Sequence, residues 1–515
     1  MKKLLFIFIA GVAVLGTSCK KYLDINKNPN DATDVIPSLV FPQAQAFTAN
    51  TLNSFNNYGS QTGIYVANAG GYGGFGEAVT YNYTTTSTGI FNSSYDNLED
   101  YQYVIDRTDG DSLAARYNAA ARIMKAFHFQ LLVDAFNNVP YFDALKGDAV
   151  LTPAYDDAKV IYKDLVDELD KAKATIKAST GKIGVADMGN TDIMFNGDMT
   201  QWVKLANTIK LRIILRAGDK VTFSNTDFTG GFLETDVLID PKYVRDNNRQ
   251  NPSWNQWAYT STGTVANKSW MPSSFIFGFY NGESLIDESR GRATYYKFPA
   301  TGNNRLGVEN NNVPASPEGS FWYADNNREG KSAGNATGIL KGPDAPYPLM
   351  LAAESFFLRA EAALKGLTTE DETTLFDQGL VASFAYTLSG RKNSPPGTPA
   401  DSVAVYKTAN AASYLVNFNL AASDDQRLEA IITQKFIANN FIRGEEAWNE
   451  YRRTRFPRIN PNGNGFETFA SSVSQSPRPD KLPTRILYPI TEGSTNGDHV
   501  PPGISPFTSL IFWAQ

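Results

Sequence analysis

The sequence predicts a mainly α-helical fold, in which helical pairs form a scaffold that carries long irregular loop segments. Apolar residues recur at helical spacing in several long stretches, and Pro or Gly separates those stretches. Residues from about 220 to 346 are instead polar and irregular. Helices of about 15–25 residues with Ala-rich faces are typical of antiparallel pairs, as in tetratricopeptide arrays, although the strict repeat consensus is absent.

The N-terminus has the pattern of an export signal. Lys2 and Lys3 precede an apolar run from Leu4 to Leu15, which is too short to span a bilayer. Small residues then lead to Cys19, the only cysteine of the chain. We expect residues 1–18 to be a lipoprotein signal peptide, Cys19 to carry the lipid, and residues 19–35 to form the tether. The alternative is an incidental cysteine beside an ordinary cleavage site. One departure from the lipoprotein pattern is Gly16, because Leu is commoner three residues before the lipidated cysteine.

Composition and charge indicate a globular domain that does not bind nucleic acid. The 515 residues are 42% hydrophobic and 19% charged, and the formal net charge is −6. An acidic chain is poorly suited to a phosphate backbone. There is no second long apolar run and no cysteine besides Cys19, so we expect a domain without disulfides that is stabilised by its core.

A helix is expected near Ile36–Phe55, and a segment rich in glycine and aromatic residues follows it from Tyr58 to Asn92. This segment lacks the Gly-Lys-Ser/Thr ending of a phosphate loop. Its aromatic rings, Tyr72 and Phe75 among them, are suited to the flat apolar faces of sugars. The alternative is an ordinary surface loop whose aromatic residues pack onto the core.

The next elements are helices, and the irregular segment comes after them. Amphipathic helices are expected between Tyr95 and Ala217. The irregular segment, about 220–346, contains four tryptophans that are either buried under the loops or available for contact: Trp254, Trp257, Trp270 and Trp322. Arg290 could hydrogen-bond a ligand, although solvated charge is the commoner role.

Helices are expected to resume at Tyr347 and again near Asp371–Leu388, and 471–515 is expected to wrap the domain as coil. Between them, Gln426–Ile459 predicts two helices. Gly444 is expected to interrupt them in a left-handed conformation. Glu445 and Glu446 suit the start of the second helix, and Pro457 prevents its continuation.

Six segments, taken in order, resemble those of the SusD/RagB family of outer-membrane nutrient-binding lipoproteins. They are AARIMKAFHFQLLVDAFNNVPYFDALKG, TPAYDDAKVIYKDLVDELDKA, WVKLANTIKLRIILR, YPLMLAAESFFLRAEAALKG, QKFIANNFIRGEEAWNEYRRTRFPRI and ILYPITEGSTNG. The resemblance implies that 36–515 is one nutrient-binding domain whose irregular segments form the binding face. It raises the expectation that Trp270, Trp322 and Tyr323 contact the ligand.

The resemblance also implies the partners. The protein is expected to lie on the outer membrane, lipid-anchored and facing the cell exterior. It is expected to bind oligosaccharides, with peptides as the alternative, and to deliver them to a SusC-like TonB-dependent transporter. Two further alternatives stay open, a lipid-anchored hydrolase of the same polymers and a helical-repeat scaffold that binds only proteins.

The residues themselves predict no catalytic, cofactor or metal site. The two histidines are His128 and His499, and His128 lies in an Ala-rich helix where a packing role is expected. Neighbouring carboxylates, as at Asp156–Asp157, occur where helices should start, so we interpret them as caps. Spacing alone does not exclude a glycosidase pair, because its two carboxylates are usually distant in sequence.

Overall fold

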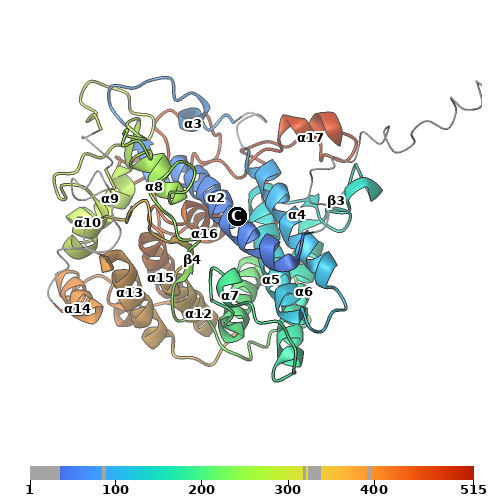
Figure 1. The fold of residues 1–515 in the computed structure, drawn as a ribbon. Helices are drawn as coiled ribbons and strands as arrows, with labels where there is room; N and C mark the ends of the chain where they lie inside the picture. The colour runs from blue at the N-terminus through green and yellow to red at the C-terminus, as the bar shows by residue number, and fades with distance from the viewer. Residues whose placement is uncertain (1–34, 84–88, 317–320, 323–337, 391–396) are drawn as a thin grey trace, which may run out of the picture.

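The computed structural model describes residues 35–83, 89–316, 321–322, 338–390 and 397–515, and these are mainly helical, as predicted (Figure 1). The expected signal peptide, Cys19, Tyr323 and nearly all of the tether lie outside the described residues.

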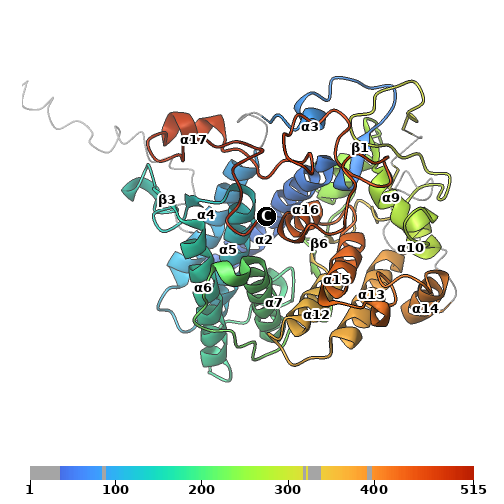
Figure 2. The same cartoon turned by 180° about the vertical axis from the view of Figure 1, so that it is seen from behind.

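Five long helices form the N-terminal half of the scaffold. They are α2 (Pro37–Gly59), α4 (Ile90–Thr108), α5 (Ala115–Phe136), α6 (Ala158–Ser179) and α7 (Met199–Ala217). α5 packs against α4 and α6, and α6 packs against α7 (Figure 2). Asp157 and Asp198 cap the free backbone N–H groups at the starts of α6 and α7. The predicted helical pairs are therefore present, and the Asp156–Asp157 pair provides a cap.

The irregular segment contains only short elements over its described residues. They are β4 (Val237–Ile239), α8 (Pro252–Trp257), β5 (Trp270–Pro272), α9 (Ser274–Asn281) and α10 (Glu288–Thr294). β5 pairs antiparallel with β1 (Val66–Asn68), which leads into the glycine-rich loop and the one-turn helix α3 (Glu77–Thr80). A similar two-residue ladder joins β2 (Val139–Pro140) to β3 (Tyr155–Asp156). Pairing of β1 with β5 brings the glycine-rich loop beside the irregular segment.

The prediction that a helix resumes at Tyr347 is wrong, because a short strand comes before the helix. Tyr347–Met350 is β6, a largely buried strand that pairs antiparallel with β4. A short, almost continuous apolar run suits a buried strand as well as a helix, and the tertiary partner decides between them. The helices that follow are α12 (Ala352–Leu364), α13 (Glu372–Leu388), α14 (Pro399–Ala409), α15 (Asp424–Ala438), α16 (Gly444–Thr454) and α17 (Ile490–Thr495).

α2 and α16 lie between the α4–α6 group and the α12–α15 group (Figure 1). Gly444 is the first residue of α16, and it is not left-handed as the sequence analysis expected. The left-handed residue is Phe441, with φ 62°. A Cβ on Gly444 would lie 2.6 Å from the Asn56 carbonyl oxygen, and one on Gly59 would lie 2.2 Å from the backbone of Gly444. Both glycines permit close approach of two helix backbones.

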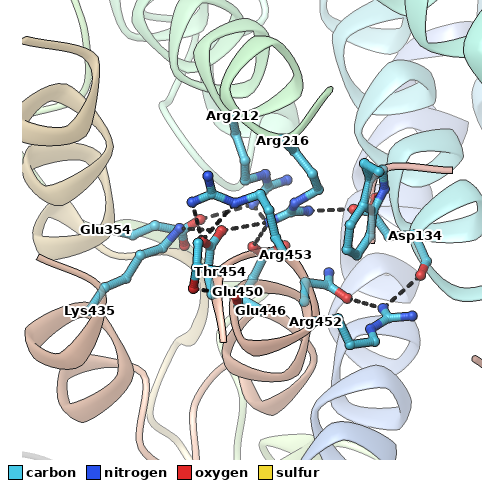
Figure 3. A network of polar contacts seen from close by, with 12 residues as sticks. Asp134, Arg212, Arg216, Glu354, Lys435, Glu446, Glu450, Arg452, Arg453 and Thr454 are labelled. Carbon is cyan, nitrogen blue, oxygen red and sulfur yellow. Dashed lines mark hydrogen bonds and ion pairs between the residues drawn. The ribbon is translucent and has the colours of Figure 1, made fainter. Parts of the chain in front are cut away.

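α16 also carries the centre of a buried ion-pair network that joins it to α5 and α7 (Figure 3). Glu446 accepts from Arg216 at 2.6 Å and lies 3.3 Å from Arg212, and all three side chains are at most 1% exposed. Arg216 also pairs with Asp134 of α5. Burial opposes ionisation of Glu446, but Arg212 and Arg216 outweigh it and hold the pKa of this carboxyl well below its usual range.

The C-terminal segment is mostly coil around the short α17, as predicted, and its end is held in the same region. Trp513 is 4% exposed, and its indole N–H donates to Asp134 at 3.0 Å. Its ring also lies 4.9 Å from the Arg452 guanidinium. Trp513 thus packs against side chains of α5 and α16. In the part of the chain that the structure describes, no helix has the length and apolarity of a bilayer-spanning segment.

Candidate ligand-binding surface

Phe75 and Trp270 meet at the β1–β5 ladder, and Tyr72 lies on the same loop three residues before Phe75; we call these three residues the aromatic surface. Trp270 begins β5 and lies opposite Asn68 of β1. The rings of Phe75 and Trp270 meet edge to face with centroids 5.2 Å apart, and both are half-buried. Tyr72 is 44% exposed on the loop that precedes Phe75. Residues far apart in sequence therefore contribute to one exposed region.

The glycine-rich loop is fixed at its base and open at its tip. Ala69 donates to the Ser269 carbonyl at 2.8 Å, and Gly70 donates to the Pro314 carbonyl at 2.9 Å. Gly71 and Gly74 have positive φ, and a Cβ on either would meet nothing within 4 Å. Glycine is required here by backbone conformation, because L residues with a side chain avoid this region. The loop thus presents Tyr72 outward from an anchored base.

Exposed polar side chains lie on a turn next to the base of the glycine-rich loop. The Gly70–Pro314 hydrogen bond places the preceding turn next to the loop, and Glu309, Asn310, Asn311 and Asn312 in that turn are exposed. Asn68 and Asn304 hold its start by donating to the Val308 carbonyl at 2.8 and 3.0 Å. Aromatic faces next to amide and carboxylate groups are suited to sugars, which offer apolar CH faces and hydroxyls together.

Trp322 does not belong to this surface, and the expectation that it contacts the ligand is corrected. Its ring is fully buried and stacks on Phe441 with centroids 4.1 Å apart and planes 2° apart. Trp257 packs against it edge to face at 5.4 Å and, like Trp254, is 2% exposed. The sequence analysis left open whether the loop tryptophans are buried or used for contact, and these three are buried. Tyr323 lies outside the described residues.

Other candidate chemistry also has a structural role. Arg290 is not a solvated charge as expected. Its side chain is 1% exposed, pairs with Asp287 at 2.5 Å and lies 4.3 Å from the Phe384 ring centroid. His128 packs in the core with Nε2 2.9 Å from Thr48 Oγ1, and burial lowers its pKa to about 3. Within the described ranges, no group of three or more His, Cys, Asp or Glu converges as a metal site.

The geometry defines a helical scaffold that displays aromatic rings on irregular loops. Residues 29–489 match a family described as "Starch-binding associating with outer membrane", and the chain belongs to this SusD-like family.

Solved structures agree on the fold. A SusD homologue from Bacteroides fragilis is 20% identical, covering 94% of this chain and 100% of its own, with a TM-score of 0.65. A SusD/RagB family protein from Bacteroides thetaiotaomicron is 19% identical, covering 93% and 99%, with a TM-score of 0.67. A chitin-binding SusD homologue from Flavobacterium johnsoniae is 21% identical, covering 92% and 97%, with a TM-score of 0.64. No curated protein sequence matches the chain.

Proposed function

We propose that the protein is a lipid-anchored outer-membrane protein of the cell surface. In this proposal it binds oligosaccharides and delivers them to a SusC-like TonB-dependent transporter without cleaving them. The observation that carries the ligand proposal is the aromatic surface with exposed asparagines beside it. Family membership supports the outer-membrane and nutrient-binding parts, since the family is described as starch-binding and outer-membrane associated. The transporter partner, the outward orientation and the lipid on Cys19 are inferred from the resemblance of the sequence motifs.

Sugars are favoured over other ligands for a physical reason. The Trp270 and Tyr72 rings bury apolar area without requiring a polar partner, while the neighbouring asparagine amides both donate and accept hydrogen bonds. A sugar ring requires both kinds of contact at one place. One relative with this fold is described as chitin-binding, which agrees with a glycan ligand but does not identify which glycan.

The test is calorimetry of the purified protein with maltohexaose, N-acetylchitohexaose and a panel of peptides. Truncating a stacking ring should weaken binding by about tenfold or more, corresponding to about 1–3 kcal/mol. We therefore expect Trp270→Ala and Tyr72→Ala to lose affinity. Phe142→Ala is the matched control, since Phe142 is 45% exposed and Tyr72 is 44% exposed.

The outcomes separate the alternatives. Binding of peptides without any oligosaccharide overturns the glycan proposal. Release of shorter products from a bound oligosaccharide favours the hydrolase. Equal affinity in all three variants means that the ligand binds away from the aromatic surface.

A further inference from the structure

A concave site lies on the helical scaffold, separate in sequence from the aromatic surface. It is a cavity of about 550 Å³ between α6, the start of α7 and the loop 225–230. Small-molecule sites in proteins commonly have volumes of about 300–1,000 Å³. Its apolar lining residues are Ala174, Ile176, Met199 and Val203.

The wall opposite α6 is held rigidly. The Asn207 side-chain amide donates to the Phe228, Thr229 and Gly231 carbonyls at 3.0, 3.1 and 2.8 Å. Gly230 packs so closely on α7 that a Cβ would lie 2.5 Å from Val203 Cγ1. The loop is thereby fixed against the helix, so the cavity exists before any ligand enters it.

Asp170 is the centre of the charged contacts in the cavity. Asp170 accepts from Lys210 at 2.8 and 2.9 Å and from Asn225 at 2.7 Å, and it lies 3.0 Å from Lys173. Lys210 is fully buried and also donates to the Asp227 carbonyl at 3.1 Å. The cavity lining has two carboxylates, Asp170 and Asp227, and two ammonium groups, Lys173 and Lys177.

The equal numbers of carboxylates and ammonium groups in the lining decide the class of ligand. A charged ligand would meet attraction and repulsion of similar size, so neither an anion nor a cation is favoured. A neutral polyol gains from both kinds of group, because each hydroxyl donates to a carboxylate or accepts from an ammonium. The apolar lining residues complement the CH face of a sugar ring.

We propose that this cavity is a second, accessory binding site for a neutral sugar unit. The inference rests on the proposed function as a glycan-binding protein and adds a site to it. The site would hold a second part of a long chain or a second molecule.

The test combines calorimetry with lysine acetylation of the full-length protein, using maltohexaose and N-acetylchitohexaose as probes. Bound sugar should protect the exposed Lys177 from acetylation and leave Lys163, exposed on the same helix, unprotected. Ala174→Trp fills the cavity from the exposed face of α6. The Ala174→Trp variant should abolish Lys177 protection and weaken oligosaccharide binding at this cavity by about tenfold or more. The control is Ala178→Trp, an exposed alanine one helical turn away that does not line this cavity.

The outcomes distinguish the two proposals. Oligosaccharide binding that leaves Lys177 unprotected and is unchanged in Ala174→Trp overturns the second site and leaves the proposed function standing. Lys177 protection that persists in Trp270→Ala shows that the second site acts independently of the aromatic surface. The absence of any oligosaccharide binding contradicts both proposals. Circular dichroism and thermal unfolding of each variant verify that the fold is retained.

Discussion

Gly59 and Gly444 occupy positions where two helices approach more closely than a side chain permits. The sequence analysis assigned Gly444 a left-handed conformation because it follows a helix, and Phe441 takes that conformation instead. Nothing in the local sequence shows that Asn56 and Ser60 lie against Gly444, because they are almost 400 residues away. A glycine can serve a turn or a close contact, and only the tertiary structure separates the two.

Gly444→Ala should therefore destabilise the protein. The added Cβ would meet the Asn56 carbonyl oxygen at 2.6 Å and the Ser60 side chain at 2.4 Å, and overpacking of this kind costs about 1–3 kcal/mol. The matched control is Gly493→Ala in α17, where a Cβ would meet nothing within 4 Å. Alanine favours a helix over glycine by about 0.5–1 kcal/mol, so the control should be as stable as wild type or slightly more stable. Urea unfolding measures both, and equal stability of the two variants would contradict the close approach.

The tryptophans show that the sequence predicted candidate contact residues but not which of them are buried. Trp270 and Trp322 lie in the same polar, irregular segment. Trp270 belongs to the aromatic surface, whereas Trp322 is buried and stacks on Phe441. Phe441 follows α15, more than 100 residues from Trp322. A loop has no helical period from which burial can be predicted, so side-chain type indicated candidates without separating them.

At the scale of elements, α16 shows which helical features are local. The acidic first turn with Glu445 and Glu446 and the end of the helix before Pro457 follow from macrodipole and proline rules, and these were predicted, whereas Gly444 was expected to interrupt the helices and is instead the first residue of α16. The partners of its carboxylates were not predicted. Glu446 meets Arg216 of α7, which is 230 residues away. Helix boundaries are encoded near the boundary, while the pairing of buried charges depends on how the helices pack.

Glu446→Gln should destabilise the protein strongly at neutral pH. Removing one partner of a buried ion pair leaves Arg212 and Arg216 undercompensated, at a cost of about 3–5 kcal/mol. Since the pKa of Glu446 is lowered in the fold, its stabilisation is complete above the unfolded value near 4.5 and declines as the pH falls below it. The deficit of the variant should accordingly be largest at pH 7 and shrink toward pH 3.

The matched control for this charge removal is Glu288→Gln. Glu288 pairs with Arg292 at 3.1 Å, but the two side chains are 68% and 52% exposed. Surface pairs contribute about 0–1 kcal/mol, so this variant should unfold close to wild type at every pH. Denaturant unfolding at several pH values measures both, and a pH-independent deficit in Glu446→Gln would count against the titration argument.

At the scale of the whole molecule, the order of helices was predictable and their three-dimensional arrangement was not. Each long helix has its own apolar period and its own stop signals. The contact of β1 with β5, which brings the glycine-rich loop to Trp270, joins residues about 200 positions apart without any local signal. The sequence motifs indicated the family, whereas the contact between the glycine-rich loop and Trp270 was visible only in the structure.

The proposed lipid anchor concerns the whole molecule, because it would decide where the proposed binding surface is held. The family is described as outer-membrane associated. Cys19 follows the apolar run and the small residues, and it is the only thiol in the chain. Two or more acyl chains anchor a protein stably, whereas one chain gives marginal binding. We therefore expect Cys19 to be acylated and the mature chain to begin there.

Cells labelled with radioactive palmitate should incorporate label into the wild-type protein, which should fractionate with the outer membrane. Cys19→Ser should incorporate none and leave the membrane fraction, because the serine hydroxyl cannot form the thioether. Ser18→Ala is the control, since it keeps a small residue before Cys19 and should be labelled like wild type. Equal labelling of wild type and Cys19→Ser would show that the cysteine is incidental. The binding surface would then need another means of reaching the membrane, and delivery to an outer-membrane transporter would lose its physical basis.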